Sequence, residues 1–105
     1  MDRLKLLFEH LEQDPKDEFL QFAIAKEYEK ADQYSEAESW YLKLRDQSSD
    51  YIGLYYNLGK LYEKMERIPD AQRIYGEGLV IAKNTNDFHA ASELNNAKMN
   101  LDIDV

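Results

Sequence analysis

The sequence predicts an all-α protein of about six helices, and two observations carry that prediction. Apolar residues recur at spacings of three and four along every segment, and no segment alternates with period two over a useful length. The chain also repeats itself, because residues 18–51 superimpose on residues 52–85 with seven identities and no gap. Roughly two identities are expected for unrelated sequence of ordinary composition. The chain is therefore built from related helical units.

The first three helices are predicted from their apolar stripes. The first ends at Asp14-Pro15, because the residue before a proline is disfavoured in a helix. The second starts near Asp17, whose carboxylate can accept hydrogen bonds from the first free amides. Asp32-Gln33-Tyr34-Ser35 predicts a short turn before the third. The three stripes are Leu4, Leu7, Phe8 and Leu11; Leu20, Ile24 and Tyr28; and Ala37, Trp40, Tyr41 and Leu44.

The last three helices follow from the same spacing. Pro69 suits the first turn of the fifth helix, where an amide hydrogen has no partner within the helix. Asn84-Thr85-Asn86-Asp87 predicts a turn with a cap before the sixth. The stripes are Leu54, Leu58, Leu61, Tyr62 and Met65; Ala71, Ile74, Tyr75, Leu79 and Ala82; and Phe88, Ala91, Leu94 and Leu101.

Length and composition bound the class of protein. The chain has 105 residues, 44% of them apolar and 32% charged, which fits a single globular domain. Its net charge of −8 disfavours nucleic acid as a partner, because a phosphate backbone repels an acidic surface. The absence of cysteine excludes disulfides, thiolate zinc sites and cysteine nucleophiles. No apolar run is longer than the four residues of 79–82, which is too short for a signal peptide or a membrane span. We therefore expect a soluble, cytoplasmic domain with no membrane partner.

A 34-residue helix–turn–helix unit with these small and large positions resembles the tetratricopeptide repeat (TPR). The family's pattern places a large residue, a Leu-Gly pair and a Tyr on the first helix, then Ala, an aromatic, Ala and a terminal Pro on the second. Residues 52–85 match it with Tyr55, Leu58-Gly59, Tyr62, Ala71, Tyr75 and the small Gly78, while Lys83 replaces the Pro. Residues 18–51 match it with Ile24-Ala25, Tyr28, Ala37 and Tyr41, whereas Leu44 and Ser49 depart from it.

The resemblance, to a small TPR domain of the bacterial type, implies a right-handed α-solenoid in four parts. Residues 1–16 form an N-terminal half-repeat helix, residues 18–51 and 52–85 form two full repeats, and residues 86–101 form a capping helix. The last helix is predicted to be a polar cap because Ser92, Glu93 and Asn96 stand where Leu, Gly and Tyr are expected.

Small residues predict where helices approach each other closely. We expect Ala71 to lie at such a contact and Ala90 and Ala97 to be exposed. Gly76-Glu77-Gly78 has no strand before it and lies in the middle of a predicted helix. It is therefore interpreted as a site of close helix packing and not as a phosphate-binding loop.

The sequence offers no support for catalysis. His10 and His89 lie near opposite ends of the sequence and neither has a histidine partner one helical turn away, so we expect no metal site. None of the serines lies in a Gly-x-Ser-x-Gly turn. Pairs of acidic residues are typical of a solvated helix face. We expect no enzyme activity and no cofactor.

Binding follows from the resemblance, because the first helix of each TPR lines a concave groove that takes a peptide or a partner helix. The predicted groove residues are Phe19, Phe22, Lys26, Lys30, Tyr56, Asn57, Lys60 and Lys64, accompanied on the same surface by Glu29, Gly53 and Glu63. Residues 52–85 carry five basic and four acidic side chains in a chain that is acidic elsewhere. This balance favours a partner segment with apolar and acidic side chains. The alternative interpretation is that Phe22 and Tyr56 pack under the terminal helices.

One subset of the family binds the C-terminal carboxylate of chaperones through Lys, Asn and Arg side chains. Those positions fall here on Phe22, Lys26, Asn57, Asp87 and Ala91, of which only Asn57 agrees. A chaperone-tail site is therefore disfavoured. We expect a non-catalytic protein–protein interaction module that binds a peptide or helix of a partner protein. The alternative is a self-associating unit that forms a homodimer through its solenoid faces.

Overall fold

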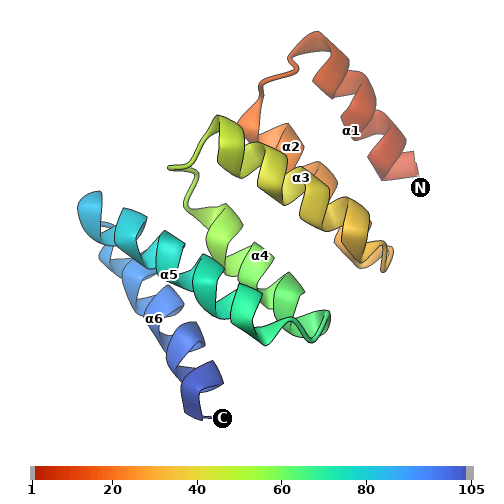
Figure 1. Cartoon of the computed structure of the whole chain (residues 1–105). Helices are drawn as coiled ribbons and strands as arrows, with labels where there is room; N and C mark the ends of the chain where they lie inside the picture. Colours follow the sequence, from red (N-terminus) through yellow and green to blue (C-terminus); the bar gives the residue numbers. More distant parts are fainter. Residues whose placement is uncertain (1, 104–105) are drawn as a thin grey trace. The chain divides into compact units, whose positions relative to one another are not determined.

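The computed structural model describes residues 2–103, and over that range it contains six α-helices and no strand (Figure 1). The all-α prediction is confirmed. The helices are α1 (Asp2–Gln13), α2 (Glu18–Lys30), α3 (Tyr34–Gln47), α4 (Gly53–Lys64), α5 (Ile68–Asn84) and α6 (Phe88–Ile103). They form two compact units, unit 1 (residues 1–51, with α1–α3) and unit 2 (residues 52–105, with α4–α6). The predicted four-part division into repeats stays a prediction.

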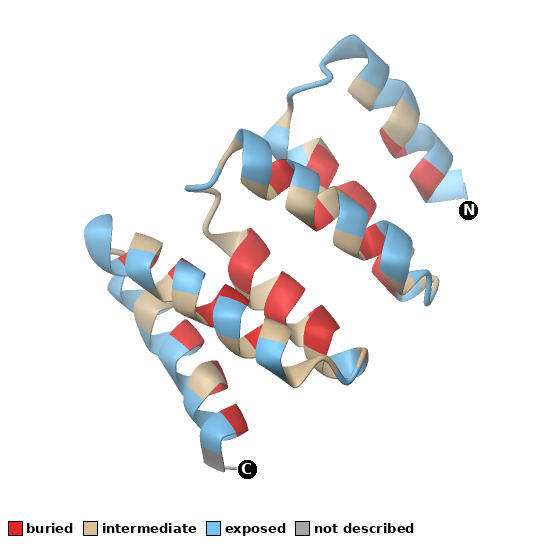
Figure 2. Ribbon diagram, in the orientation of Figure 1, coloured by how far each residue is buried: buried red, intermediate tan, exposed pale blue. Residues whose placement is uncertain are grey.

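In unit 1, α2 packs against both α1 and α3. Its core contains the predicted stripes of the first two helices, with Leu4, Leu7, Ala23 and Ile24 buried (Figure 2). The ring of Phe8 lies edge-on to that of Trp40, with 5.5 Å between the ring centroids. Edge-to-face aromatic contacts of this kind add to the hydrophobic burial. They attach the first helix to the pair formed by α2 and α3.

The predicted helix starts are confirmed by their caps. The Asp17 carboxylate accepts a hydrogen bond from the Leu20 amide at 2.9 Å, and that of Asp87 accepts one from the Ala90 amide at 3.0 Å. Pro69 lies in the first turn of α5. The predicted turn over residues 32–35 is too long by two residues, because α3 already begins at Tyr34.

The same backbone turn follows α2, α4 and α5. Its central residue is left-handed, with φ of 59°, 59° and 58° at Asp32, Glu66 and Asn86. After α4 the Arg67 amide donates back to the Tyr62 carbonyl at 2.8 Å, which satisfies one of the helix's last carbonyls. Asp32 and Glu66 occupy equivalent positions in the two predicted repeats, so the turn recurs with the repeat.

In unit 2, α5 packs against α4 and α6 with two glycines at close contacts. A Cβ atom at Gly78 would lie 2.5 Å from the Cβ of Tyr55, and one at Gly59 would overlap the ring of Tyr75. The packing interpretation of Gly76-Glu77-Gly78 is thus correct for Gly78. It is wrong for Gly76, where the nearest atom to an added Cβ would be Lys98 Cε at 3.9 Å.

Two expectations for α6 are wrong. Ala97 is 5% exposed, because it falls on the buried stripe that Leu94 and Leu101 form against the rest of unit 2. Phe88 is 75% exposed, although its spacing placed it on the apolar face. At 3.6 residues per turn, Phe88 lies about 120° around the helix from Leu94, which turns its ring away from that stripe.

Candidate functional site

Four of the eight predicted groove residues lie on α2 in unit 1 and four on α4 in unit 2. Each unit therefore offers its own surface. The assignment of these eight residues to a partner surface stays a prediction, and the structure gives their surroundings.

The two aromatic residues of α2 have different environments. Phe19 is 62% exposed. Phe22 is half-buried, and its ring centroid lies 5.5 Å from that of Tyr51 and 6.0 Å from that of Tyr41. Phe19 is thus available to a partner, whereas Phe22 also covers the buried Tyr41 ring. Both interpretations of Phe22, as a groove residue and as a packing residue, have a physical basis.

The lysines of α2 contact other residues of unit 1. Lys30 Nζ lies 3.6 Å from Glu27 Oε1, and Arg3 Nε donates to the same oxygen at 2.7 Å. Lys26 is half-buried and has an interaction partner of its own. Because Glu27 balances part of the charge of Lys30, this face is less basic than its sequence suggests.

An open, shallow cleft of about 490 Å³, here the α2–α3 cleft, lies where the start of α2 meets the end of α3. Its lining includes Lys16, Asp17, Glu18, Phe19 and Tyr51. Burial, together with the negative charges of Glu18 and Asp17, raises the pKa of Tyr51 above its usual value. The cleft therefore combines two aromatic rings with a net negative charge.

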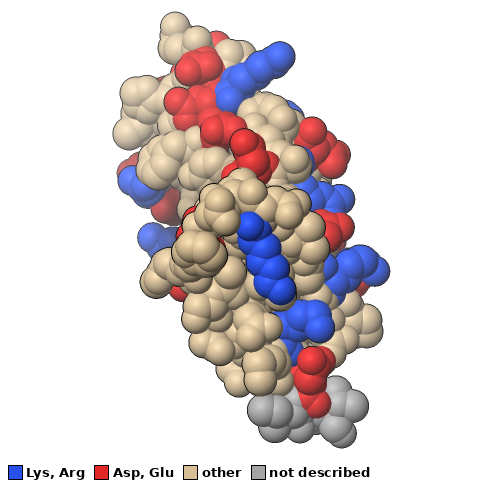
Figure 3. Space-filling model, turned by 90° about the vertical axis from the view of Figure 1, so that its left-hand side faces the viewer, with Lys and Arg blue, Asp and Glu red and all other residues tan. Residues whose placement is uncertain are grey.

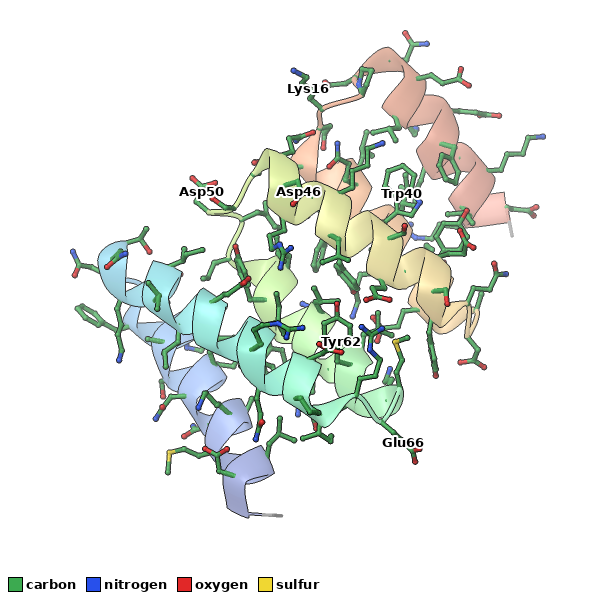
Figure 4. All side chains as sticks on the ribbon, viewed as in Figure 1. Lys16, Trp40, Asp46, Asp50, Tyr62 and Glu66 are labelled. Atoms are coloured by element: carbon green, nitrogen blue, oxygen red, sulfur yellow. The ribbon has the colours of Figure 1, made fainter. Side chains whose placement is uncertain are left out.

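Acidic side chains dominate the surface of unit 1 more widely. Residues 1–51 hold seven basic and thirteen acidic side chains. Figure 3 shows carboxylates gathered over the upper part of the face in view, which belongs to this unit. Asp46 and Asp50 project at the end of α3, at the same end of unit 1 as Lys16 (Figure 4). The field around unit 1 favours cationic partners.

On α4, Tyr56 is the centre of the predicted surface. Its ring centroid lies 6.3 Å from that of the buried Tyr75, and Lys60 Nζ lies 5.5 Å from the Tyr56 ring centroid. Lys60 also lies 3.7 Å from Glu63 Oε2. The Asn57 side-chain amide donates to the Gly53 carbonyl at 2.8 Å. The structure thus brings Tyr56 and Lys60 together, and Lys60 is paired as Lys30 is.

A narrower cleft of about 180 Å³, here the α4–α6 cleft, lies between the first turns of α4 and α6. Its lining includes Tyr56, Asn57, Asp87, His89, Glu93 and Leu94. Sequence reasoning placed Tyr56 and Asn57 on this surface but missed the contribution of Glu93. The carboxylates of Asp87 and Glu93 make the cleft acidic, whereas the charge balance of residues 52–85 suggested a less acidic surface.

A buried tyrosine donates to a carboxylate in each unit. Tyr41 Oη donates to Glu29 Oε1 at 2.9 Å, and Tyr75 Oη donates to Glu63 Oε2. Both the tyrosine and its glutamate recur at equivalent positions of the two predicted repeats. Glu29 is only 8% exposed, so the expectation that it lies on the groove surface is wrong. Its carboxylate is held inside by this bond, because a buried carboxylate needs a hydrogen-bond donor.

These Glu–Tyr bonds also change how the tyrosines ionise. Burial, and then the charge of Glu29, raises the pKa of Tyr41. Burial, and then the hydrogen bond to Glu63, raises the pKa of Tyr75. Both hydroxyls therefore stay protonated donors at neutral pH, and each joins the two helices of its pair.

Within residues 2–103, no three His, Asp or Glu side chains come together in a way that could hold a metal ion. In the same part of the chain, none of the helices combines the length and the apolar character that a membrane crossing requires.

Comparison with known proteins finds similarity among solved structures. No protein-family model matches the chain, and no curated protein matches it. The solution structure of a tetratricopeptide repeat domain protein from Salinibacter ruber is 39% identical, with a TM-score of 0.80 over 84% of this chain and 89% of that one. A crystal structure of a tetratricopeptide repeat domain protein from Salinibacter ruber is 37% identical, with a TM-score of 0.76 over 82% of this chain and 97% of that one.

A third solved structure shares the fold at lower identity. The TPR2B domain of yeast Sti1, in a complex with pHsp70, is 14% identical, with a TM-score of 0.86 over 97% of this chain and 82% of that one. At this identity the likeness concerns the fold alone.

Proposed function

Because the chain belongs to the tetratricopeptide repeat family, we propose that it is a non-catalytic protein-interaction module. It binds a peptide or helix of a partner protein through the groove faces of α2 and α4. The observation that carries this proposal is Phe19, a large aromatic side chain that is 62% exposed beside the α2–α3 cleft. Exposed aromatic rings beside a cleft are typical anchors of protein interfaces.

Further observations support the same function. Tyr56 and Asn57 line the α4–α6 cleft, so the predicted surface on α4 also borders a cleft. The Sti1 domain of the same fold is found in a complex with pHsp70, a protein partner. The cytoplasmic location expected from the sequence stays a prediction.

The experiment that tests this function uses a displayed library of random short peptides, panned against the immobilised full chain. Selected peptides are then titrated against wild type, Phe19→Ala and the control Leu6→Ala. Leu6 is a matched control because it is 52% exposed and lies on α1, outside the predicted groove. We expect Phe19→Ala to weaken binding about tenfold or more and Leu6→Ala to leave it unchanged. Neither change should lower the melting temperature.

Two results contradict this function. If no peptide is retained above background, the chain does not act as a peptide-binding module. If Leu6→Ala weakens binding as much as Phe19→Ala, binding is non-specific and the groove assignment is wrong.

Self-association is a second candidate function, favoured by exposed apolar side chains in unit 2. Phe88 is 75% exposed, Val80 58% and Met99 50%. If these side chains pair two copies, sedimentation equilibrium should show a dimer that Phe88→Ser weakens. A monomer at every concentration removes this candidate.

A further inference from the structure

We propose that the α4–α6 cleft receives a Lys or Arg side chain of the partner, so that the bound segment is basic where it meets unit 2. This inference rests on the proposed function and names the chemistry of its ligand. It also reverses the expectation from residues 52–85 that the partner segment is acidic.

The size of the cleft limits its occupant to a single side chain. At about 180 Å³ it is smaller than pockets for drug-sized molecules, which hold roughly 300–1,000 Å³. Its lining includes Leu94, which is 1% exposed, and the half-buried Tyr56. These apolar surfaces suit the methylene stem of a long side chain whose charged head remains near water.

The charges at the cleft select a cation. The described residues that line it include two carboxylates, Asp87 and Glu93, and neither Lys nor Arg. Glu93 is exposed and forms no ion pair within residues 2–103. Its charge is therefore available to a partner, since no side chain in that range neutralises it.

The groups that oppose a cation at this site are weaker. The amides at the start of α6 carry a partial positive charge, but the Asp87 carboxylate already accepts a hydrogen bond from the Ala90 amide. His89 also lines the cleft, but it is a single group against the two carboxylates of Asp87 and Glu93. Lys60 touches the Tyr56 ring but is paired with Glu63. The balance of charge stays negative.

Unit 1 has the same character by itself. Asp17 and Glu18 line the α2–α3 cleft beside Phe19, against the single basic residue Lys16. Its thirteen acidic and seven basic side chains attract the same kind of segment at longer range. A partner with basic and apolar side chains therefore suits both units.

The test uses peptides selected from the displayed library and variants that remove one charge each. Glu93→Gln removes the unpaired carboxylate. Asp87→Asn removes the second charge and keeps the helix cap, because Asn caps about as well as Asp. The matched control is Glu12→Gln, an exposed acidic residue on α1 that lines neither cleft. Fluorescence anisotropy of the labelled peptides then gives the dissociation constants, and melting curves confirm that each variant folds.

We expect the selected peptides to be enriched in Lys or Arg. We expect Glu93→Gln and Asp87→Asn each to weaken their binding about three- to tenfold, and Glu12→Gln to change it less than twofold. Added salt should weaken wild-type binding more than that of Glu93→Gln. A panning of Glu93→Lys should enrich basic peptides less than a panning of wild type does.

Other outcomes separate this inference from the proposed function. Peptides that depend on Phe19 but carry no basic residue, or that bind Glu93→Gln as tightly as wild type, overturn the inference and leave the proposed function standing. An equal loss in Glu12→Gln also overturns it, because general charge and not the cleft then selects the peptides. If no peptide binds at all, both fail.

Discussion

Replacing Gly78 by alanine should destabilise unit 2, whereas the same replacement at Gly76 should stabilise it. The two glycines lie in α5, on either side of Glu77. An added Cβ at Gly78 would lie 2.5 Å from the Tyr55 Cβ and 3.1 Å from Leu94 Cδ1. At Gly76 the nearest atom is Lys98 Cε at 3.9 Å, an ordinary contact. Comparing the two variants isolates the effect of packing on stability, because the chemical change and the helix are the same in both.

The magnitudes follow from two opposing effects. Alanine is favoured over glycine inside a helix by about 1 kcal/mol, and this gain applies at both positions. At position 78 the clash involves Tyr55 Cβ, which is fixed to the backbone of α4, so the two helices must move apart. Overpacking of this kind costs about 1–3 kcal/mol, and the separation also weakens neighbouring contacts. We therefore expect Gly76→Ala to gain up to about 1 kcal/mol and Gly78→Ala to lose about 1–2 kcal/mol.

Urea unfolding followed by far-ultraviolet circular dichroism measures both changes. With a slope near 1–3 kcal/mol per molar urea, the two variants should shift the midpoint in opposite directions by several tenths of a molar unit or more. If both variants shift it in the same direction by similar amounts, the close contact between α4 and α5 at Tyr55 does not exist in solution.

Three further predictions concern the turn, the tyrosines and the repeat contact. Glu66→Gly should raise the free energy of unfolding by about 0.5–1 kcal/mol in urea titrations, because Glu66 has φ of 59°, which strains any side chain. Asn86→Gly should raise it less, since asparagine tolerates this conformation. Equal increases for the two variants would show that backbone strain at Glu66 is not the cause. Burial and the neighbouring carboxylates raise the pKa of Tyr41 and Tyr75. The stabilisation from each tyrosine is therefore complete below the unfolded pKa of about 10, and above it the free energy of unfolding falls by about 1.4 kcal/mol per pH unit for each. Tyr41→Phe should remove one such increment from the slope of the free energy of unfolding against pH above about pH 10, and an unchanged slope would show that this hydroxyl ionises normally. Ala71→Leu should lose about 1–3 kcal/mol, because Ala71 is fully buried, and an unchanged melting temperature would mean that the repeat register is wrong.

Local structure could be predicted because its causes lie close together in the sequence. Asp17 and Asp87 cap helices through amides in the first turn, and Pro69 suits a first turn by its own chemistry. The recurrence of Tyr41 as Tyr75 in the next repeat marked two tyrosines that the structure buries. In each case one residue type at one spacing is sufficient for the prediction. The interacting groups either lie within one helical turn or recur at the same spacing in both repeats.

The errors arise where a residue's environment depends on a neighbouring helix. Phe88 and Ala97 both belong to α6, and their apolar spacing could not show which side of that helix faces α5. Gly76 and Gly78 are the same residue type in the same helix, yet only Gly78 lies against the Cβ atom of a residue in another helix, Tyr55. Glu29 was expected on the surface with the charged residues around it, but Tyr41 from α3 supplies the donor that keeps it inside.

The sequence by itself determined the class, the helices and the repeat, because helical periodicity and capping are properties of consecutive residues. It also indicated the helix faces that carry Phe19, Tyr56 and the lysines. Only the tertiary structure decided what those faces offer a partner. It paired Lys30 and Lys60 with carboxylates of their own helices. It also brought Glu93 of α6, and Asp87 just before that helix, beside Tyr56 of α4. The sign of the net charge at a candidate binding site depends on side chains that meet across helices far apart in the sequence. The count of acidic and basic residues within 52–85 could therefore not reveal it.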